Sequence, residues 1–258
     1  DLTAEFSATE ALARALEEAD REGTLKAVLK AQGYLLSDSE GKPETLYQVS
    51  GARSLDDSGL DFEVVTWALD GLGGKVEQHI QIGWDGALNS YSKRWIKITG
   101  EVVYTSTGKR KASGRLELRT KQEFSRTHTQ VFNCTDDTVP HHIVLFFLSR
   151  LAEHIGPAPW RIRYDDQITH GRGLLRATLP DIDSWEGQFV RTLVVEDAGS
   201  GGITPMRLRI ATTEHTGLRW GESLNGTGAL SPISTKRFQE LRPYPFAPDS
   251  YRPAEGLE

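Results

Sequence analysis

The sequence predicts a mainly β protein with few helices, in which a long antiparallel meander curls into a half-barrel or barrel around a buried apolar helix. Three observations support this fold class. Segments between about 24 and 133 alternate apolar and polar residues, as half-buried strands do. Short turns join these segments, whereas parallel crossovers need roughly a dozen residues or more. One segment, about 140–154, is instead almost wholly apolar and predicts a buried helix.

Composition excludes several classes of protein. The 258 residues are 38% hydrophobic and 26% charged, as in folded globular proteins. The net charge of −6 indicates no nucleic-acid partner, because phosphate neutralisation needs a basic surface. No apolar run approaches the roughly 20 residues of a membrane-spanning helix. The single cysteine, Cys134, excludes an intramolecular disulfide and a cysteine-based zinc site.

The first expected element is an N-terminal helix, within residues 1–23. Ser7 and Glu10 have the spacing of a capping box. An apolar stripe follows at helical spacing, made of Leu12, Leu16 and Ala19. Gly23 stands where a left-handed C-terminal cap belongs. We expect this helix to pack on the outside of the sheet or at one mouth of it.

A single curled β domain is expected over residues 24–235. Its first strands are predicted at 24–36, 44–55, 60–69, 75–84, 89–98, 100–107, 109–120 and 124–133. The reversals between them are predicted at Asp85-Gly86, Thr99-Gly100 and Thr107-Gly108. The sheet is expected to resume at 159–179, 188–197 and 205–217. Residues 236–258 are expected to form an irregular tail packed by aromatics and stiffened by prolines.

The segment 140–154 predicts the buried plug helix of this domain. Pro140 suits the first helical turn, and Gly156-Pro157 ends the helix. Apolar side chains surround the predicted helix on nearly all sides: Ile143, Val144, Leu145, Phe146, Phe147, Leu148 and Leu151. A helix that is apolar all round is buried, so Phe146, Phe147 and Leu151 are expected to be largely inaccessible.

The layout resembles the periplasmic lipoprotein-carrier half-barrels and related uncharacterised envelope proteins. The resemblance is carried by "VPHHIVLFFLSRL" at the plug position and by the basic-apolar alternations "WRIRY" and "PMRLRIAT". It extends from residue 24 to about 224. It implies a concave apolar cavity and a role in the cell envelope, and it transfers no site residue. Because the chain opens at Asp1 without Met, we expect a removed signal peptide and a periplasmic or secreted location.

Two polar clusters could be taken for metal or acid–base sites: His141 and His142 after Asp136 and Asp137, and Asp165 and Asp166 before His170. Adjacent residues at a helix start point about 100° apart, so two neighbouring histidines rarely bind one ion. Adjacent aspartates on a strand face opposite ways. We therefore expect no metal, no cofactor and no catalytic residue in either cluster.

The functional hypothesis is a monomeric, non-catalytic envelope protein that binds a lipid, an acyl chain or a protein partner on a concave sheet. Its ligand-binding residues are predicted to be Trp67, Trp84, Tyr91 and Trp95, because aromatics offer a broad apolar surface with one polar edge. The alternative for these rings is simple packing against the plug helix. Two other functions stay open. One is an enzyme acting on an extracellular polymer through Arg161, Arg163, Tyr164, Arg207 and Arg209, and the other is a purely structural envelope component.

Overall fold

The structure is a computed structural model of the chain that divides into two compact units. The first unit comprises Asp1–Leu29, Gly83–Leu88 and Cys134–Thr227, and the second comprises Lys30–Ile82, Asn89–Asn133 and Gly228–Glu258. The structure describes residues 6–69, 74–133, 143–148, 160–166, 171–178, 182–185, 188–197, 206–211, 218–223 and 228–243. No helix within these described ranges is both long and apolar enough to cross a membrane.

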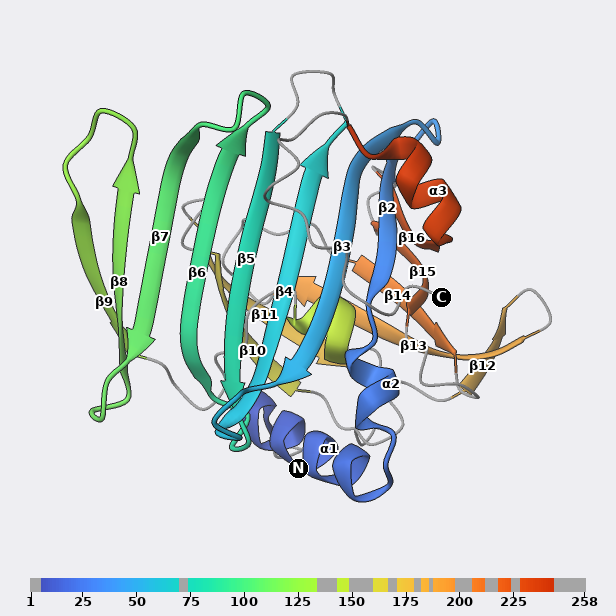
Figure 1. Ribbon diagram of the computed structural model, residues 1–258. Helices are drawn as coiled ribbons and strands as arrows, with labels where there is room; N and C mark the ends of the chain where they lie inside the picture. The colour runs from blue at the N-terminus through green and yellow to red at the C-terminus, as the bar shows by residue number, and fades with distance from the viewer. Residues whose placement is uncertain are drawn as a thin grey trace. The chain divides into compact units, whose positions relative to one another are not determined.

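The second unit contains a nine-stranded antiparallel sheet in the order β16-β2-β3-β4-β5-β6-β7-β8-β9 (Figure 1). The strands are β2 (Gln32–Asp38), β3 (Pro43–Arg53), β4 (Gly59–Ala68), β5 (Gly74–Gly83), β6 (Leu88–Lys97), β7 (Val102–Arg110), β8 (Arg115–Gln122), β9 (His128–Asn133) and β16 (Gly228–Ile233). From β2 to β9 each strand pairs with the next one along the chain, which confirms the predicted meander. The sheet is not closed, because the described strands β16 and β9 are not paired with each other.

The short helix α3 (Thr235–Leu241) packs against one face of the second unit's sheet, at β2 to β4. Phe238 of α3 packs in a cluster with Leu35, Leu46 and Trp67, which lie on β2, β3 and β4 in turn. Val49 of β3 is fully buried as well. Since neighbouring residues of a strand point to opposite faces, Val49 points to the opposite face of β3 from Leu46.

The first unit combines helices with a second group of strands. Its helices are α1 (Ala8–Arg21), α2 (Leu25–Leu29) and the π-helix η1 (Ile143–Leu148). Its strands are β1 (Phe6–Ser7), β10 (Trp160–Asp166), β11 (Gly171–Thr178), β12 (Ile182–Trp185), β13 (Gln188–Asp197), β14 (Met206–Ala211) and β15 (Leu218–Ser223). They pair in the order β1-β10-β11-β13-β14-β15, with β12 beside β13. All of these pairs are antiparallel except the two-residue pair of β1 with β10.

The N-terminal helix is confirmed in position and in its apolar face. Leu12, Leu16 and Ala19 are buried. Gly23 adopts a φ of +74° after the last turn. The Thr24 amide donates to the Ala19 carbonyl at 2.9 Å, which is the six-to-one hydrogen bond of a Schellman motif. Gly23 therefore forms the left-handed C-terminal cap of α1 that its position in the sequence predicts.

The predicted buried helix is present in the described segment η1. Ile143, Phe146 and Phe147 are all completely buried. The other residues of the predicted range, including Pro140 and Leu151, lie outside the described residues, as do His141 and His142.

Three local predictions were wrong. Residues 25–29, expected as the start of a strand, form α2, because Leu25, Val28 and Leu29 have helical spacing and are buried together. The tail expected from residue 236 begins with α3, whose N-cap Ser234 accepts a hydrogen bond from the Arg237 amide at 3.2 Å.

The third error concerns the reversal expected at Thr107-Gly108. Gly108 instead lies inside β7, and the chain reverses near Gly114, which has a φ of +76°. A Cβ at Gly108 would lie 3.0 Å from Leu118 Cδ1. The glycine is therefore needed for cross-strand packing rather than for a turn.

The reversal predicted at Asp85-Gly86 is confirmed, and it predicts a measurable effect of substitution. Gly86 has a φ of +74°, and a Cβ there would lie 2.0 Å from the Thr9 carbonyl oxygen of α1. We expect Gly86→Ala to lower the free energy of unfolding by about 2–4 kcal/mol, from backbone strain and from the displaced helix. Chemical denaturation would measure the loss.

Gly100→Ala is the matched control for this substitution. Gly100 occupies the next hairpin turn with a φ of +86°, but a Cβ there would have no atom of the described residues within 4 Å. In this variant the free energy of unfolding should fall only by the cost of the backbone strain, about 1–2 kcal/mol. Equal losses in the two variants would contradict the contact between the Gly86 turn and α1.

Candidate ligand-binding face

The four predicted ligand-binding residues are distributed over three places. Trp67 lies on β4 in the cluster with Phe238. Trp84 lies in the segment Gly83–Leu88, which belongs to the first unit. Tyr91 and Trp95 lie on β6 in the second unit. Because Tyr91 and Trp95 are four residues apart on one strand, their side chains share a face of the sheet.

Tyr104 of β7 lies on the same face as Tyr91 and Trp95. Trp95 stands directly opposite Tyr104 across the β6–β7 pair, and Tyr91 stands opposite Gly108. Tyr91, Trp95 and Tyr104 are here called the aromatic face. Trp95 is 50% exposed, whereas the two tyrosines are half-buried. An exposed indole beside two partly exposed phenols forms a surface that an apolar molecule can cover.

The glycines of neighbouring strands shape the aromatic face. A Cβ at Gly74 of β5 would lie 2.9 Å from the Trp95 indole nitrogen. Next to Gly108, Leu118 of β8 continues the same row and is buried. The missing side chains at these two glycines therefore leave room for the rings and leucines around them.

The polar groups of this face are suited to orienting a bound ligand rather than to catalysing a reaction. The Tyr91 hydroxyl donates to Gln78 Oε1 at 3.4 Å. Lys93 lies between Tyr91 and Trp95 on the same side of β6, opposite the buried Ser106. The face thus offers an apolar surface with a cation inside its boundary.

Trp67 occupies a packing position. Its ring meets the Phe238 ring edge-on, with centroids 5.5 Å apart and an angle of 80°. Trp67 is buried, and its indole nitrogen has no hydrogen-bond partner among the described residues. The ring packs against α3 in this structure, and the role of Trp67 in ligand binding stays a prediction.

A buried charge cluster on β5 and β6 was not predicted. Lys75 Nζ lies 2.6 Å from Glu77 Oε1, and Arg94 donates to the other carboxylate oxygen of Glu77. Lys75 and Glu77 are both buried. Desolvation alone would raise the pKa of Glu77, but hydrogen bonds and charges from Lys75 and Arg94 outweigh it and hold this pKa below its ordinary value.

The cluster leaves Glu77 ionised, so this carboxylate is poorly suited to act as a general acid or base near neutral pH. The sequence signal that could have identified it is Lys75-x-Glu77, two charges of one parity on a strand otherwise rich in buried residues. Tyr47 of β3 is equally unsuited to titrate. Burial, followed by the charge of Glu44, raises the pKa of Tyr47 to about 12.

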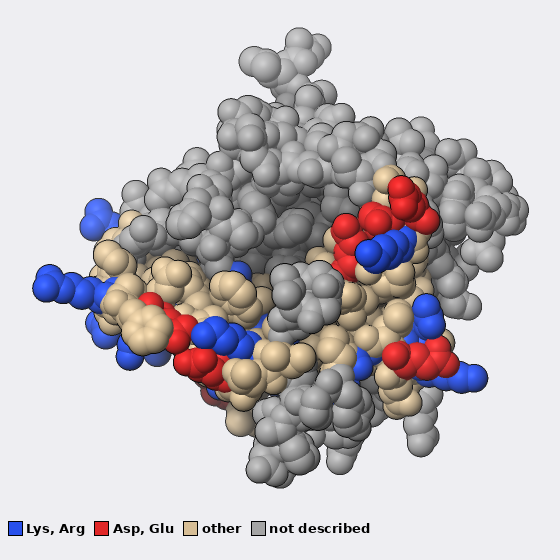
Figure 2. Space-filling model, turned by 90° about the horizontal axis from the view of Figure 1, so that it is seen from above, with Lys and Arg blue, Asp and Glu red and all other residues tan. Residues whose placement is uncertain are grey.

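Exposed charges are paired across hairpins. Lys97 Nζ lies 3.0 Å from Glu101 and 3.0 Å from Glu123. Hydrogen bonds to these two carboxylates raise the pKa of Lys97. Figure 2 shows Lys and Arg side chains next to Asp and Glu side chains over the described part of the surface seen from above.

The two polar clusters of the sequence remain predictions. Asp165 and Asp166 end β10, and their side chains are outside the described part of the structure. The same holds for Asp136, Asp137, His141, His142 and His170. Among the described residues, no group of three or more His, Cys, Asp or Glu side chains could hold a metal ion.

An open antiparallel sheet built mainly from a meander places the chain among β-barrel-like proteins. It is similar to the crystal structure of a β-barrel-like protein of the domain of unknown function DUF1849 from Brucella abortus. The TM-score is 0.50 at 12% sequence identity, and the match covers 80% of this chain and 96% of that chain. No family model and no curated protein matches the sequence. The similarity supports the β-barrel-like fold, and the resemblance to the lipoprotein carriers stays a prediction.

Proposed function

We propose that this chain is a non-catalytic, exported envelope protein that binds an apolar molecule, such as a fatty acyl chain, on the aromatic face. The observation that carries the proposal is the half-exposed Trp95 indole opposite Tyr104, with Tyr91 further along the same side of β6. Large aromatic side chains are normally well buried in a monomeric protein. An acyl chain laid along this row would remove apolar surface from water, which is favourable by roughly 25 cal/mol per Å².

The charge on the aromatic face favours an acyl chain that ends in a carboxylate. Lys93 lies between the two aromatic residues of β6. A fatty acid could place its chain on the rings and its carboxylate near the ammonium group, in the way amphipathic side chains divide between apolar and polar surroundings. The competing enzymatic hypothesis depends on side chains of β10 and β14 that lie outside the described part of the structure.

A binding experiment tests the proposal. Delipidated protein titrated with a fluorescent fatty acid is expected to show a saturable change of Trp emission, with a dissociation constant of about 1 μM. Trp95→Ala should weaken binding of the probe about tenfold or more, measured from the probe's own fluorescence. Native mass spectrometry of protein purified without detergent should show a co-purified lipid.

Val131→Ala is the control. Val131 is exposed on β9 opposite Glu117, on the other face of the sheet from Leu118 and Tyr91. This variant should bind the fatty acid as the unaltered chain does. If Trp95→Ala lowers stability but leaves the affinity unchanged, the aromatic face packs the protein and binds nothing.

A further inference from the structure

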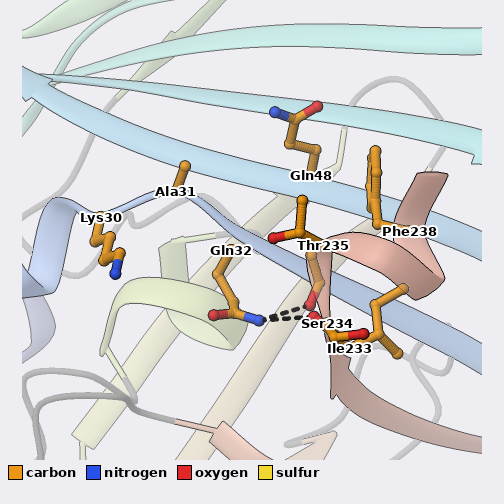
Figure 3. A pocket seen from close by; sticks show the side chains of 9 residues that line it. Lys30, Ala31, Gln32, Gln48, Ile233, Ser234, Thr235 and Phe238 are labelled. Atoms are coloured by element: carbon orange, nitrogen blue, oxygen red, sulfur yellow. Dashed lines mark hydrogen bonds between the residues drawn. The ribbon is translucent and has the colours of Figure 1, made fainter. Parts of the chain in front are cut away.

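A hollow beside α3 and a pair of exposed hairpin turns both lie outside the aromatic face of the second unit. The hollow has a volume of about 180 Å³ (Figure 3). Gln32 Nε2, which lines it, donates to the carbonyls of Gly33 and Ile233 at 3.1 and 3.2 Å. Ser234 Oγ accepts from the Arg237 amide. These polar groups hold β2, β16 and α3 together, whereas the two turns present side chains to a partner.

The exposed turns bring apolar side chains to one end of the sheet. Ile98 in the turn between β6 and β7 and Val102 at the start of β7 are each 43% exposed. Phe124, in the turn between β8 and β9, is fully exposed. Alternate turns of an antiparallel meander lie at the same end of the sheet, and both turns lie at the top of the strands in Figure 1. Ile98, Val102 and Phe124 are here called the tip residues.

Hydrogen bonds and ion pairs join the two turns into one surface. The Glu123 amide donates to the Val103 carbonyl of β7 at 2.8 Å. Lys97, at the end of β6, donates through Nζ to the carboxylates of Glu101 and Glu123, one beside each turn. Figure 2 looks onto this end of the sheet and shows uncharged side chains beside acidic and basic ones. The tip residues therefore belong to one surface that combines apolar and charged groups.

Phe124 is held in an exposed position with a strained backbone. Its φ of 60° is rare for a bulky side chain. The Ser125 amide and hydroxyl both donate to the Gln122 carbonyl at 3.0 Å, which maintains this conformation of the turn. Large aromatic side chains are normally well buried, and strained backbone conformations concentrate at functional sites. An exposed, strained phenylalanine at the end of a hairpin therefore indicates a surface that meets a partner.

The charge around the exposed ring indicates the chemistry of that partner. Lys121 and Arg126 precede and follow the ring, both are exposed, and neither side chain forms an ion pair with another described residue. The two carboxylates beside the turns, Glu101 and Glu123, are both paired with Lys97. These turns therefore carry three positive and two negative charges, although the whole chain has a net charge of −6. The two unpaired cations are complementary to an anionic surface.

We propose that these turns dock the protein on an anionic lipid bilayer. The side chains of Phe124 and Ile98 enter the region of the acyl chains, and Lys121 and Arg126 stay at the level of the headgroup phosphates. Removal of the apolar side chains from water and attraction between the cations and the phosphates both favour this arrangement. This docking site goes beyond the proposed apolar-ligand function and does not rest on it, because none of the tip residues belongs to the aromatic face.

Flotation with lipid vesicles tests the proposal. At low salt the unaltered chain is expected to float with vesicles of equal parts phosphatidylglycerol and phosphatidylcholine. Binding to vesicles of phosphatidylcholine alone should be at least about tenfold weaker, because each cation near an anionic surface contributes roughly fivefold. Added salt should weaken binding to the anionic vesicles, since it screens these charges. Failure to float with the anionic vesicles at low salt, or equal binding to both kinds of vesicle, would overturn the proposal.

Substitutions separate the apolar and the ionic contributions. Phe124→Ala should weaken binding to the anionic vesicles about tenfold, because the ring no longer leaves water on docking. The double substitution Lys121→Gln and Arg126→Gln should weaken it at least about tenfold and make the remaining binding less sensitive to salt. Leu55→Ala is the control and should bind vesicles as the unaltered chain does. Leu55 is fully exposed too, but its turn between β3 and β4 lies at the opposite end of the sheet.

Circular dichroism would show whether the variants are folded, and Ile98→Ala provides a second test in the same direction if Phe124→Ala is not. Unchanged vesicle binding by folded Phe124→Ala would contradict insertion of the tips. Self-association that Phe124→Ala abolishes, without vesicle binding by the unaltered chain, would assign the tips to a contact between copies and refute the docking site. Without vesicles, Phe124→Ala should bind the fluorescent fatty acid normally, which separates failure of the tips from failure of the aromatic face.

Discussion

Replacement of Phe147 by Ala is expected to lower the free energy of unfolding by about 3–5 kcal/mol. Phe147 is completely buried in η1, as are Phe146 and Ile143. Removing the ring deletes a large apolar contact area and leaves a cavity that the close-packed surroundings refill only in part. Urea denaturation followed by circular dichroism would measure the difference.

Phe124→Ala is the matched control for this experiment. Phe124 is fully exposed in the turn between β8 and β9 and has a φ of 60°. Its removal deletes the same atoms without opening a cavity, so little change in stability is expected. A loss below about 1 kcal/mol for Phe147→Ala would show that η1 is peripheral to the core of the first unit.

Glu77→Gln is expected to lower the free energy of unfolding at neutral pH by about 3–5 kcal/mol. The substitution keeps the shape of the side chain but removes the charge that neutralises the buried Lys75. A buried ammonium group without a counter-charge is strongly destabilising. Glu117→Gln is the control, since Glu117 bonds to Lys111 and Arg119 on the surface and should matter little.

The effect of Glu77 should depend on pH in a defined direction. Its pKa in the folded chain lies below the ordinary value of 4.5. Its contribution is therefore fully present above about pH 4.5 and is lost as the pH falls through the lower, folded pKa. The stability difference between the unaltered chain and Glu77→Gln should shrink over that acidic range. A difference that is constant down to the acid transition would contradict the ionic role of Glu77.

Local patterns in the sequence were sufficient for most of the fold. The helix stripe of Leu12, Leu16 and Ala19 and the two-residue alternation from β2 to β9 both depend on neighbours along the chain. Gly108 shows the limit, because a glycine that serves packing looks the same in sequence as a glycine that serves a turn. Residues 25–29 show another, since five residues fit the helical and the strand period almost equally well.

The candidate sites were less predictable because they depend on distant partners. The aromatic surface of Tyr91 and Trp95 followed from strand parity alone. The contact of Trp67 with Phe238 could not be predicted in this way, because α3 lies far along the chain from β4.

The pairing of β16 with β2 has a consequence for how the protein is made. Gln32 and Ile233 are joined by a hydrogen bond although they are 201 residues apart in sequence. During synthesis β2 therefore leaves the ribosome long before the strand that covers its free edge, and α3 follows later still. Chains cut short before residue 228 would expose that edge and the apolar face beneath Phe238, and unpaired edges of this kind promote association between chains. A nascent chain therefore keeps this edge exposed, and stays prone to aggregation, until the residues from 228 onward have been synthesised and have paired with β2.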